Sequence, residues 1–365
     1  MNKTMNQTCS KCVLPIDYLN IKLDENGICQ WCRDYKQIDY LGADNLLKDI
    51  QEPLSRNTSK KYDCVVGFSG GRDSTFILWY VVKILKLRPL AVFSDDLFIP
   101  EFAYDNIKNT AQVLGVDLKI IKHNYLKKCV KHHLSAWIKR PVAETLMFIN
   151  VGERLGYETL VEQEAIKEGV KLIFGGRSPI QSEETYKTDI MKINHKGGRF
   201  SWFLGWCKQV LLNPALIMNP YCLKLQYLEF MITRKKEKMI KKHNLVIIHP
   251  YYKYVHWEEK TIENILFDEL NWKMPNDAKT SGRIGCQIDT LRQYLFYRTL
   301  GYNDYNVDLS VLIRDNQITR EEAINKLKEV QTLPVEYIKM IVNNAGIDAE
   351  KFMKILDKKY PSNEN

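Results

Sequence analysis

A glycine-rich stretch at residues 67–75, GFSGGRDST, carries two serine hydroxyls, a guanidinium and a carboxylate within one turn. The apolar run Tyr62–Phe68 leads into it and predicts a buried strand, and a largely apolar run with helical spacing follows it. A strand, a glycine turn and a helix in this order direct unpaired backbone N–H groups and the positive helix end toward an anion. The stretch is therefore predicted to bind phosphate.

The residue types exclude the Walker loop, because Gly71 is followed by Arg72 and Asp73 rather than by the required lysine. The glycines let the backbone approach two linked phosphates, and the serines add hydroxyl donors. Asp73 would repel phosphate unless a cation lay between them, so we expect it to hold Mg²⁺ and to be catalytic. Arg72 either contributes to nucleotide binding or points to solvent.

The pattern S-G-G-x-D-S resembles the pyrophosphate loop (PP-loop) of the ATP pyrophosphatase superfamily. The resemblance implies that ATP is split between its α- and β-phosphates, which leaves an adenylated acceptor and free pyrophosphate. Many relatives have lysine at position 72, so the arginine departs from the pattern. The expected nucleotide-binding residues of the loop are Ser69, Gly70, Gly71, Arg72, Asp73 and Ser74.

The segments after the loop alternate between strand and helix patterns. Pro89–Phe93 and residues 118–121 read as strands, and a helix is expected between them at about Phe102–Leu114. This alternation predicts an α/β fold with a doubly wound parallel sheet, similar to that of the adenine nucleotide alpha hydrolases.

The carboxyl ends of the predicted strands are the expected ligand sites, as in other open parallel sheets. Adenosine is expected near Val92–Asp96, with Phe93 as a binding residue. The neighbouring Asp95 and Asp96 could bind a metal or the ribose, and two solvated carboxylates at a strand end are the alternative.

A second glycine pair follows the expected strand Leu172–Phe174. Gly175 and Gly176 would permit close backbone approach to the nucleotide, although glycine pairs are also ordinary turn residues. Arg177 comes next, and we expect it to be catalytic by clamping the α-phosphate or stabilising charge in the transition state.

Four of the nine cysteines form two C-x-x-C pairs, Cys9 with Cys12 and Cys29 with Cys32. Two such pairs at this separation predict a closed tetrahedral zinc site within a ribbon of structural function. A redox pair or free thiols are the alternative. Among the remaining cysteines, Cys286 could be a reactive thiol, because glycines and polar residues surround it.

The net charge of +9 favours polyanionic partners such as tRNA, nucleotides or sugar nucleotides. The basic run Thr233–His243 is either a solvated helix face or a nucleic-acid contact, and Ile193–Phe200 either covers the substrate or forms a surface turn. The apolar stretch Gln209–Leu223 is too short and too broken to span a membrane, and the first ten residues lack a secretory signal. A cytoplasmic location is expected.

Three regions are predicted: a zinc ribbon at 1–45, a PP-loop ATP pyrophosphatase domain at 46–243, and a helical C-terminal region at 244–365. In the last region Thr319 and Glu322 form a capping-box pattern at the start of a helix. A further helix is expected from Pro334 to Gly346.

Together, the pairs CSKC and CQWC, the SGGRDS loop and the later segment ITREEAINKL resemble the N-acetyl sugar amidotransferase family. The resemblance implies a lipopolysaccharide or other surface-polysaccharide role, or one in nonulosonic-acid biosynthesis, with an acetamido group converted to an acetamidino group. ATP, Mg²⁺ and Zn²⁺ are the implied cofactors. The chain has no recognisable glutaminase nucleophile, so ammonia is expected from a separate glutaminase partner.

Two other functions remain open. A tRNA-thiolating enzyme would use the same adenylation, but Cys64, Cys129 and Cys286 offer no recognisable catalytic pair. A non-catalytic nucleotide-binding zinc-ribbon protein is the second alternative. Asp73 argues against it, because a binding module has little use for a carboxylate among phosphates.

Overall fold

The computed structural model describes residues 7–17, 21–150, 159–180, 204–205, 207–208, 211–275, 280–282, 285–331 and 334–361. The segment 193–200, proposed above as a substrate-covering loop, lies outside these residues.

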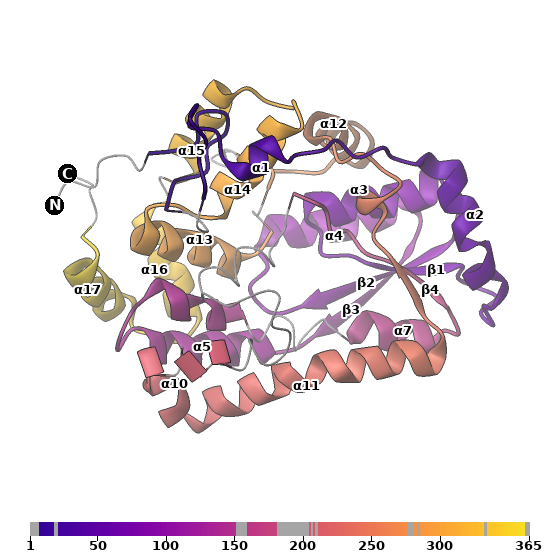
Figure 1. Cartoon of the computed structure of the whole chain (residues 1–365). Coiled ribbons are helices and arrows are strands. Elements are labelled where there is room, and N and C mark those ends of the chain that lie inside the picture. Colours follow the sequence, from indigo (N-terminus) through magenta and orange to yellow (C-terminus); the bar gives the residue numbers. More distant parts are fainter. Residues whose placement is uncertain are drawn as a thin grey trace.

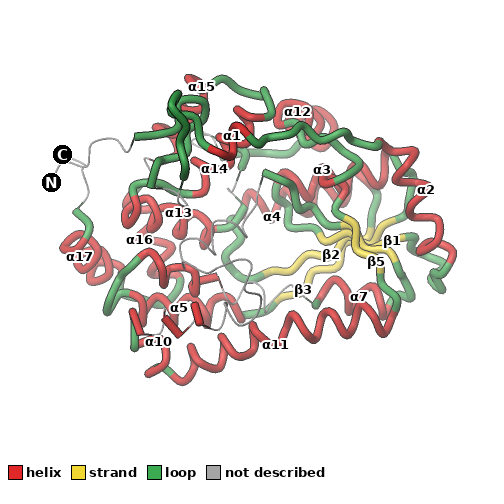
Figure 2. The backbone as a smooth tube through the Cα atoms, viewed as in Figure 1, coloured by secondary structure: helices red, strands yellow, loops and turns green. Residues whose placement is uncertain are grey.

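The centre of the molecule is a parallel sheet of five strands in the order β3-β2-β1-β4-β5 (Figure 2). Every neighbouring pair of strands is parallel, so the predicted α/β fold with a doubly wound parallel sheet is confirmed. The strands are β1 (Cys64–Gly67), β2 (Pro89–Asp95), β3 (Asp117–Lys122), β4 (Leu172–Phe174) and β5 (Val246–Ile248).

Helices cover both faces of this sheet (Figure 1). On one face, α3 packs against β1 and β2, and α4 contacts α3 and β3. On the other face, α7 contacts β1, β2 and β4, and the long α11 crosses α7 and α5. The helices named here are α3 (Arg72–Lys83), α4 (Glu101–Leu114), α5 (Tyr125–Trp137), α7 (Leu160–Lys167) and α11 (Pro220–His243).

The burial of the strands follows their sequence. Residues 64–66 of β1 are fully buried, as expected for an apolar strand with neighbours on both sides. The edge strand β3 instead alternates exposed and half-buried residues. The chain runs from β1 outward through β2 and β3 and then returns to place β4 on the other side of β1, which makes the carboxyl ends of β1 and β4 the topological switch point.

The sheet extends past residue 243, where the sequence pattern appeared to end the nucleotide domain. Strand β5 pairs with β4 after a left-handed turn at Asn244, whose φ is 53°. Strand β5 has only three residues, which is too short for the periodicity of the sequence to indicate a strand.

The C-terminal region is helical, as predicted. Its capping box is present, because the backbone N–H of Thr319 donates to Glu322 and that of Glu322 to the Thr319 hydroxyl. The helix predicted from Pro334 to Gly346 is present over Val335–Asn344, and Gly346 follows it with a φ of +81°. After the short η3 (Pro250–Tyr252), the region contains α12 (Glu259–Leu270), α13 (Gln287–Leu300), α14 (Asp304–Arg314), α15 (Arg320–Gln331), α16 (Val335–Asn344) and α17 (Ala349–Lys359).

The N-terminal segment lies against this helical region rather than against the sheet (Figure 1). Its short helix α1 (Gln30–Arg33) follows two isolated antiparallel bridges, and α2 (Gly42–Ser55) then runs beside the sheet and contacts β4. Two further short elements are η1 (Ala143–Asn150) and α10 (Ala215–Met218). Within the described ranges, no helix has both the length and the apolar character needed to cross a membrane.

Candidate functional site

The turn between β1 and α3 has the backbone shape that its glycines predict. Gly70 has a φ of +74°, and a Cβ atom there would lie 2.3 Å from Cγ1 of Ile107 on α4. Glycine is therefore required at this position both for its conformation and for close packing. The indole of Trp272 donates to the carbonyl oxygen of Gly70 over 3.2 Å, which fixes the turn from the C-terminal side.

The two serines of the loop are hydrogen-bonded to each other. The Ser74 hydroxyl accepts the backbone N–H of Ser69 at 3.1 Å, and the two hydroxyl oxygens are 2.9 Å apart. The backbone N–H of Gly71 points at the Ser69 hydroxyl at 3.4 Å. Hydroxyl and amide donors thus converge at the first turn of α3, where the helix dipole favours an anion.

The second predicted glycine pair meets this loop at the switch point. A Cβ atom on Gly176 would lie 2.7 Å from Cα of Ser74, so the β4 end passes directly over the start of α3. A Cβ atom on Gly175 would lie 2.4 Å from Cε1 of His249, the residue that follows β5. The two strand ends therefore face the crevice that the sequence analysis expected them to share.

Asp73 is held on both sides at the start of α3. Its side chain is 8% exposed, and its two carboxylate oxygens accept hydrogen bonds of 3.2 Å from Arg72 Nε and Ser178 Oγ. The hydroxyl of the buried Tyr251 donates to the Asp73 carbonyl oxygen. Mg²⁺ prefers oxygen ligands such as carboxylates, and the Asp73 carboxylate is fixed beside the backbone amides expected to bind phosphate. The residue therefore fits the predicted metal.

The side chain of Arg72 is buried and does not point to solvent. Its Nη1 donates to Glu259 at 2.8 Å and to the Ser281 hydroxyl at 2.7 Å. Its guanidinium also stacks over Trp257 at 4.6 Å from the ring centroid. The alternative in which this side chain points to solvent is therefore wrong, because it is buried and joins the loop to the C-terminal region.

The electrostatics of this contact are those of a buried charge network. Burial alone would raise the pKa of Glu259, but the positive charges of Arg72 and Lys326 outweigh that effect and lower it. Lys326 Nζ donates to the second carboxylate oxygen of Glu259 at 2.9 Å. The carboxylate therefore stays ionised between two cations.

The residues predicted to act at the end of β2, Phe93, Asp95 and Asp96, are all buried. The Phe93 ring is 1% exposed and packs edge-on against Tyr104, so any nucleotide contact by Phe93 is left to its main chain. Asp95 and Asp96 are also buried and accept the backbone N–H groups of Leu97 and Phe98 respectively. Both carboxylates therefore shape the turn after β2, and the alternative of two solvated carboxylates is wrong.

Arg177 is exposed beyond the β4 end, close enough to His249 for its charge to act on that imidazole. Burial is the largest cause that lowers the pKa of His249, and Arg177 adds to it. The Nδ1 atom of His249 is buried and has no hydrogen-bond partner among the described residues. The sequence analysis missed His249 and Tyr251, although both follow the short apolar run at residues 246–248 as strand-end residues do.

The four predicted cysteine ligands come together at the N-terminus. All four sulfur atoms lie within 4.8 Å of one another, and all four residues are buried. Hydrogen bonds from the thiols of Cys29 and Cys32 lower the pKa of Cys12, so one sulfur is favoured as thiolate. Backbone N–H groups of Cys12 and Cys29 point at Cys9 Sγ. This closed, all-sulfur arrangement fits the predicted tetrahedral zinc.

The cysteine cluster is also anchored to the helical region. The Ser310 hydroxyl on α14 accepts the backbone N–H of Val13, and the Asn306 amide donates to the Val13 carbonyl oxygen. Arg320 donates to the carbonyl oxygen of Cys12 and to Thr8. A metal bound there would therefore stabilise the packing of the N-terminal segment on α14 and α15.

Comparison with known proteins agrees with this architecture. Residues 247–365 match the family described as LPS biosynthesis protein WbpG-like, C-terminal domain. The chain is 29% identical over 161 residues to an uncharacterized protein of Methanocaldococcus jannaschii. This alignment covers 40% of this chain and 58% of that protein.

Two solved structures resemble the chain weakly. The NH3-dependent NAD synthetase of Campylobacter jejuni, in complex with the nitrate ion, is 20% identical with a TM-score of 0.28, over 38% of this chain and 56% of its own. The U34-tRNA thiolase NcsA of Methanococcus maripaludis, with its 4Fe-4S cluster, is 15% identical with a TM-score of 0.34, over 91% of this chain and 90% of its own. The chain thus spans less than two thirds of the curated relative and of the synthetase.

The SGGRDS turn thus lies at the switch point of a parallel sheet, which is the arrangement expected of a PP-loop enzyme. The match to the WbpG-like C-terminal domain family covers the C-terminal third of the chain.

Proposed function

We propose that the protein is an ATP-dependent amidotransferase that converts the acetamido group of a surface-polysaccharide or nonulosonic-acid sugar to an acetamidino group. The observation that carries this proposal is the position of Asp73 between the amide-rich turn and the β4 end. The WbpG-like match of the C-terminal region supports the polysaccharide context.

The proposed reaction has two steps. The amide oxygen of the acceptor attacks the α-phosphorus of ATP, the bond between the α- and β-phosphates breaks, and pyrophosphate leaves. Ammonia then adds to the amide carbon, loses a proton, and AMP departs with the former amide oxygen. The net change replaces the carbonyl oxygen by NH and converts ATP to AMP and pyrophosphate.

The residues of the loop have distinct tasks in this proposal. The amides of residues 69–71 and the hydroxyl of Ser74 bind and orient the leaving pyrophosphate. Asp73 would hold Mg²⁺, which supplies charge neutralisation between the phosphates when bound. Arg177 is proposed to neutralise charge at the α-phosphate from the opposite strand end.

The rest of the proposal concerns partners and organisation. We propose a zinc ribbon at 1–45, a PP-loop domain from 46 that includes β5, and a helical C-terminal region. Zinc would be held by the four clustered cysteines, ammonia would come from a separate glutaminase, and the reaction would take place in the cytoplasm.

A tRNA-thiolating enzyme is the second candidate, and one observation favours it. Cys286 begins α13 directly after Gly285, where a Cβ atom would lie 3.9 Å from Cα of Gly71. This brings a cysteine near the loop, although thiolation of this kind calls for a pair.

The test is to incubate purified protein with ATP, Mg²⁺, ammonium and a panel of UDP- and CMP-linked acetamido sugars, with undermodified tRNA in a parallel reaction. We expect AMP, pyrophosphate and a sugar in which oxygen is exchanged for NH, and no product when glutamine replaces ammonium. Asp73→Asn should abolish AMP formation, and Asp105→Asn, which removes an exposed carboxylate on α4, should not. AMP release with tRNA alone would favour tRNA as the acceptor, and a sulfur-containing product after addition of sulfide would establish thiolation. Nucleotide binding without turnover would favour the non-catalytic alternative.

A further inference from the structure

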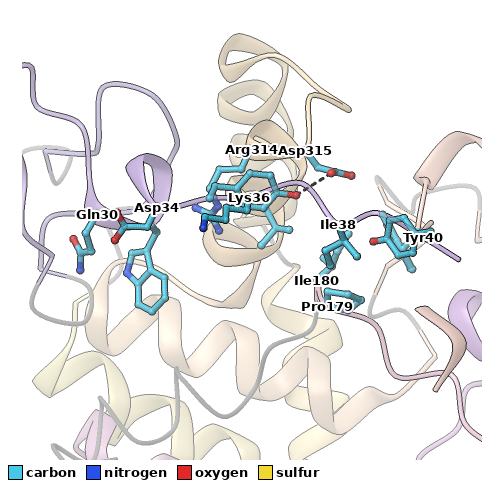
Figure 3. Close-up of a pocket in the computed structure, with 13 residues that line it drawn as sticks. Gln30, Asp34, Lys36, Ile38, Tyr40, Pro179, Ile180, Arg314 and Asp315 are labelled. Atoms are coloured by element: carbon cyan, nitrogen blue, oxygen red, sulfur yellow. Dashed lines mark hydrogen bonds between the residues drawn. The ribbon is translucent and has the colours of Figure 1, made fainter. Parts of the chain in front are cut away.

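A cavity of about 530 Å³ lies between the N-terminal segment and the helical region, outside the PP-loop turn. Its volume is in the range of roughly 300–1,000 Å³ that small-molecule sites occupy. In Figure 3 the linker carrying Lys36 and Ile38 runs between the helix end that carries Arg314 and Asp315 and the Pro179–Ile180 segment.

The lining combines aromatic rings with polar groups, as carbohydrate sites do. Trp31, Tyr35 and Tyr40 provide flat apolar surfaces on which a sugar ring or base can stack, and Trp31 is 39% exposed. The Tyr35 hydroxyl donates to the Asp315 carboxylate at 2.8 Å. A dashed line in Figure 3 ends at Asp315.

The cavity lining carries two acidic side chains, Asp34 and Asp315, and two basic ones, Lys36 and Arg314. The Asp315 carboxylate is already hydrogen-bonded to Tyr35, Gln317 and His256, so its oxygens are occupied within the protein. Arg314, by contrast, has a buried Nη1 atom with no hydrogen-bond partner among the described residues. A buried, unsatisfied guanidinium donor is costly unless a ligand supplies the acceptor.

A second unused donor lies in the same lining. Trp257 is 2% exposed, and its buried Nε1 atom also has no partner within the described part of the chain. Both residues line the cavity, and a ligand with several acceptor oxygens would satisfy the two donors once the side chains that cover these atoms shift.

The cavity is connected to the PP-loop by shared side chains. Trp257 lines the cavity and stacks on Arg72, the guanidinium that also bonds Asp73. Pro179 lines it as well and directly follows Ser178, which donates to the Asp73 carboxylate. A ligand in the cavity would therefore lie one layer of side chains from the expected site of ATP cleavage.

We propose that this cavity binds the acceptor as an anionic acetamido sugar, with its ring on the aromatic side chains and its acidic group on Arg314. The identity of the ligand rests on the proposed function, whereas the site rests on the cavity itself. The anion could be the diphosphate of a sugar nucleotide or the carboxylate of a nonulosonic acid, and both present the same oxygens to a guanidinium.

The experiment measures binding rather than turnover. Isothermal titration of the full chain with UDP-N-acetylglucosamine, N-acetylneuraminic acid and neutral N-acetylglucosamine distinguishes the two anions from the sugar alone. We expect one anionic probe to bind, and Arg314→Gln to weaken it by about tenfold or more, since one hydrogen bond to a charged group is lost. Trp31→Leu should weaken the same probe through lost stacking.

Arg56→Gln is the matched control, because it removes a guanidinium at the end of α2 that does not line the cavity. All variants should keep the ATP affinity and circular dichroism of the unmodified chain. The proposal is overturned if no probe binds, if Arg314→Gln leaves binding unchanged, or if the neutral sugar binds as tightly as both anions. If an acceptor binds but is not amidinated, the proposed reaction is contradicted and the proposed binding site still holds.

Discussion

The guanidinium of Arg72 lies 4.6 Å from the ring centroid of Trp257, and 185 residues separate the two in the chain, since 257 − 72 = 185. The residue that stands at the variable position of the phosphate loop is therefore part of the contact between the nucleotide domain and the C-terminal region. This contact ties the start of α3 to α12 and to the wall of the cavity. A change in the cavity can reach the phosphate loop through one pair of side chains.

Arg72→Met should destabilise the protein strongly, because it leaves the buried carboxylate of Glu259 with only Lys326 as its cationic partner. Breaking a buried pair from one side costs about 3–5 kcal/mol, and replacing both partners costs much less. Urea denaturation of Arg72→Met, Glu259→Leu and the double variant measures this. If the double variant is no more stable than Arg72→Met, the two side chains do not act as a pair.

Gly176→Ala should impair ATP binding, because its Cβ would lie 2.7 Å from Cα of Ser74 and would displace the first turn of α3. Gly67→Ala is the control, since a Cβ there meets nothing closer than 3.6 Å and lies on the neighbouring strand end. Titration with ATP and thermal unfolding would be compared for the two. Equal ATP affinity in both variants would show that the close approach of the β4 end does not shape the loop.

The sequence was sufficient for those parts of the site that a local pattern encodes. The loop, the strand ends and the two C-x-x-C pairs each place several chemically distinct residues within a few positions, and the structure brings the cysteines together as expected. Glycines at 70 and 176 were chosen as residues of close approach, and each has less than 3 Å of space for a Cβ.

Contacts between distant segments could not be predicted in this way. Ser178 and Tyr251 reach Asp73 from two other strand ends, and neither lies in a recognisable motif. The direction of Arg72 depends on α12, whose position no local periodicity encodes. The cavity likewise draws its lining from four separate stretches of the chain, so it exists only once the N-terminal segment has packed on α14.

Metal removal should loosen the N-terminal segment from the helices. The four cysteine sulfurs are mutually within 4.8 Å, a spacing that crowds thiols unless a cation binds them. We expect one equivalent of zinc by elemental analysis, and a chelator or Cys12→Ser should lower the unfolding temperature. Iron with sulfide and visible absorbance in the purified protein would contradict the zinc assignment.

At neutral pH the protein should be less stable with aspartate at position 96 than with asparagine there. Burial, with the nearby charge of Asp95, raises the pKa of Asp96 from 3.8 to about 6. The folded state therefore holds a proton that the unfolded state has lost between these values, so stability falls as pH rises through this window and the cost is complete above pH 6. Asp96→Asn keeps the oxygen that accepts the Phe98 N–H and should stabilise the protein by up to about 3 kcal/mol at pH 8, but not at pH 3.5.

Asp63→Asn is the opposite case, because Arg88 lowers the pKa of Asp63, and it should destabilise the protein at pH 8. Urea denaturation of both variants across this pH range decides the point, and a pH-independent effect of Asp96→Asn would show that its carboxyl does not titrate on folding.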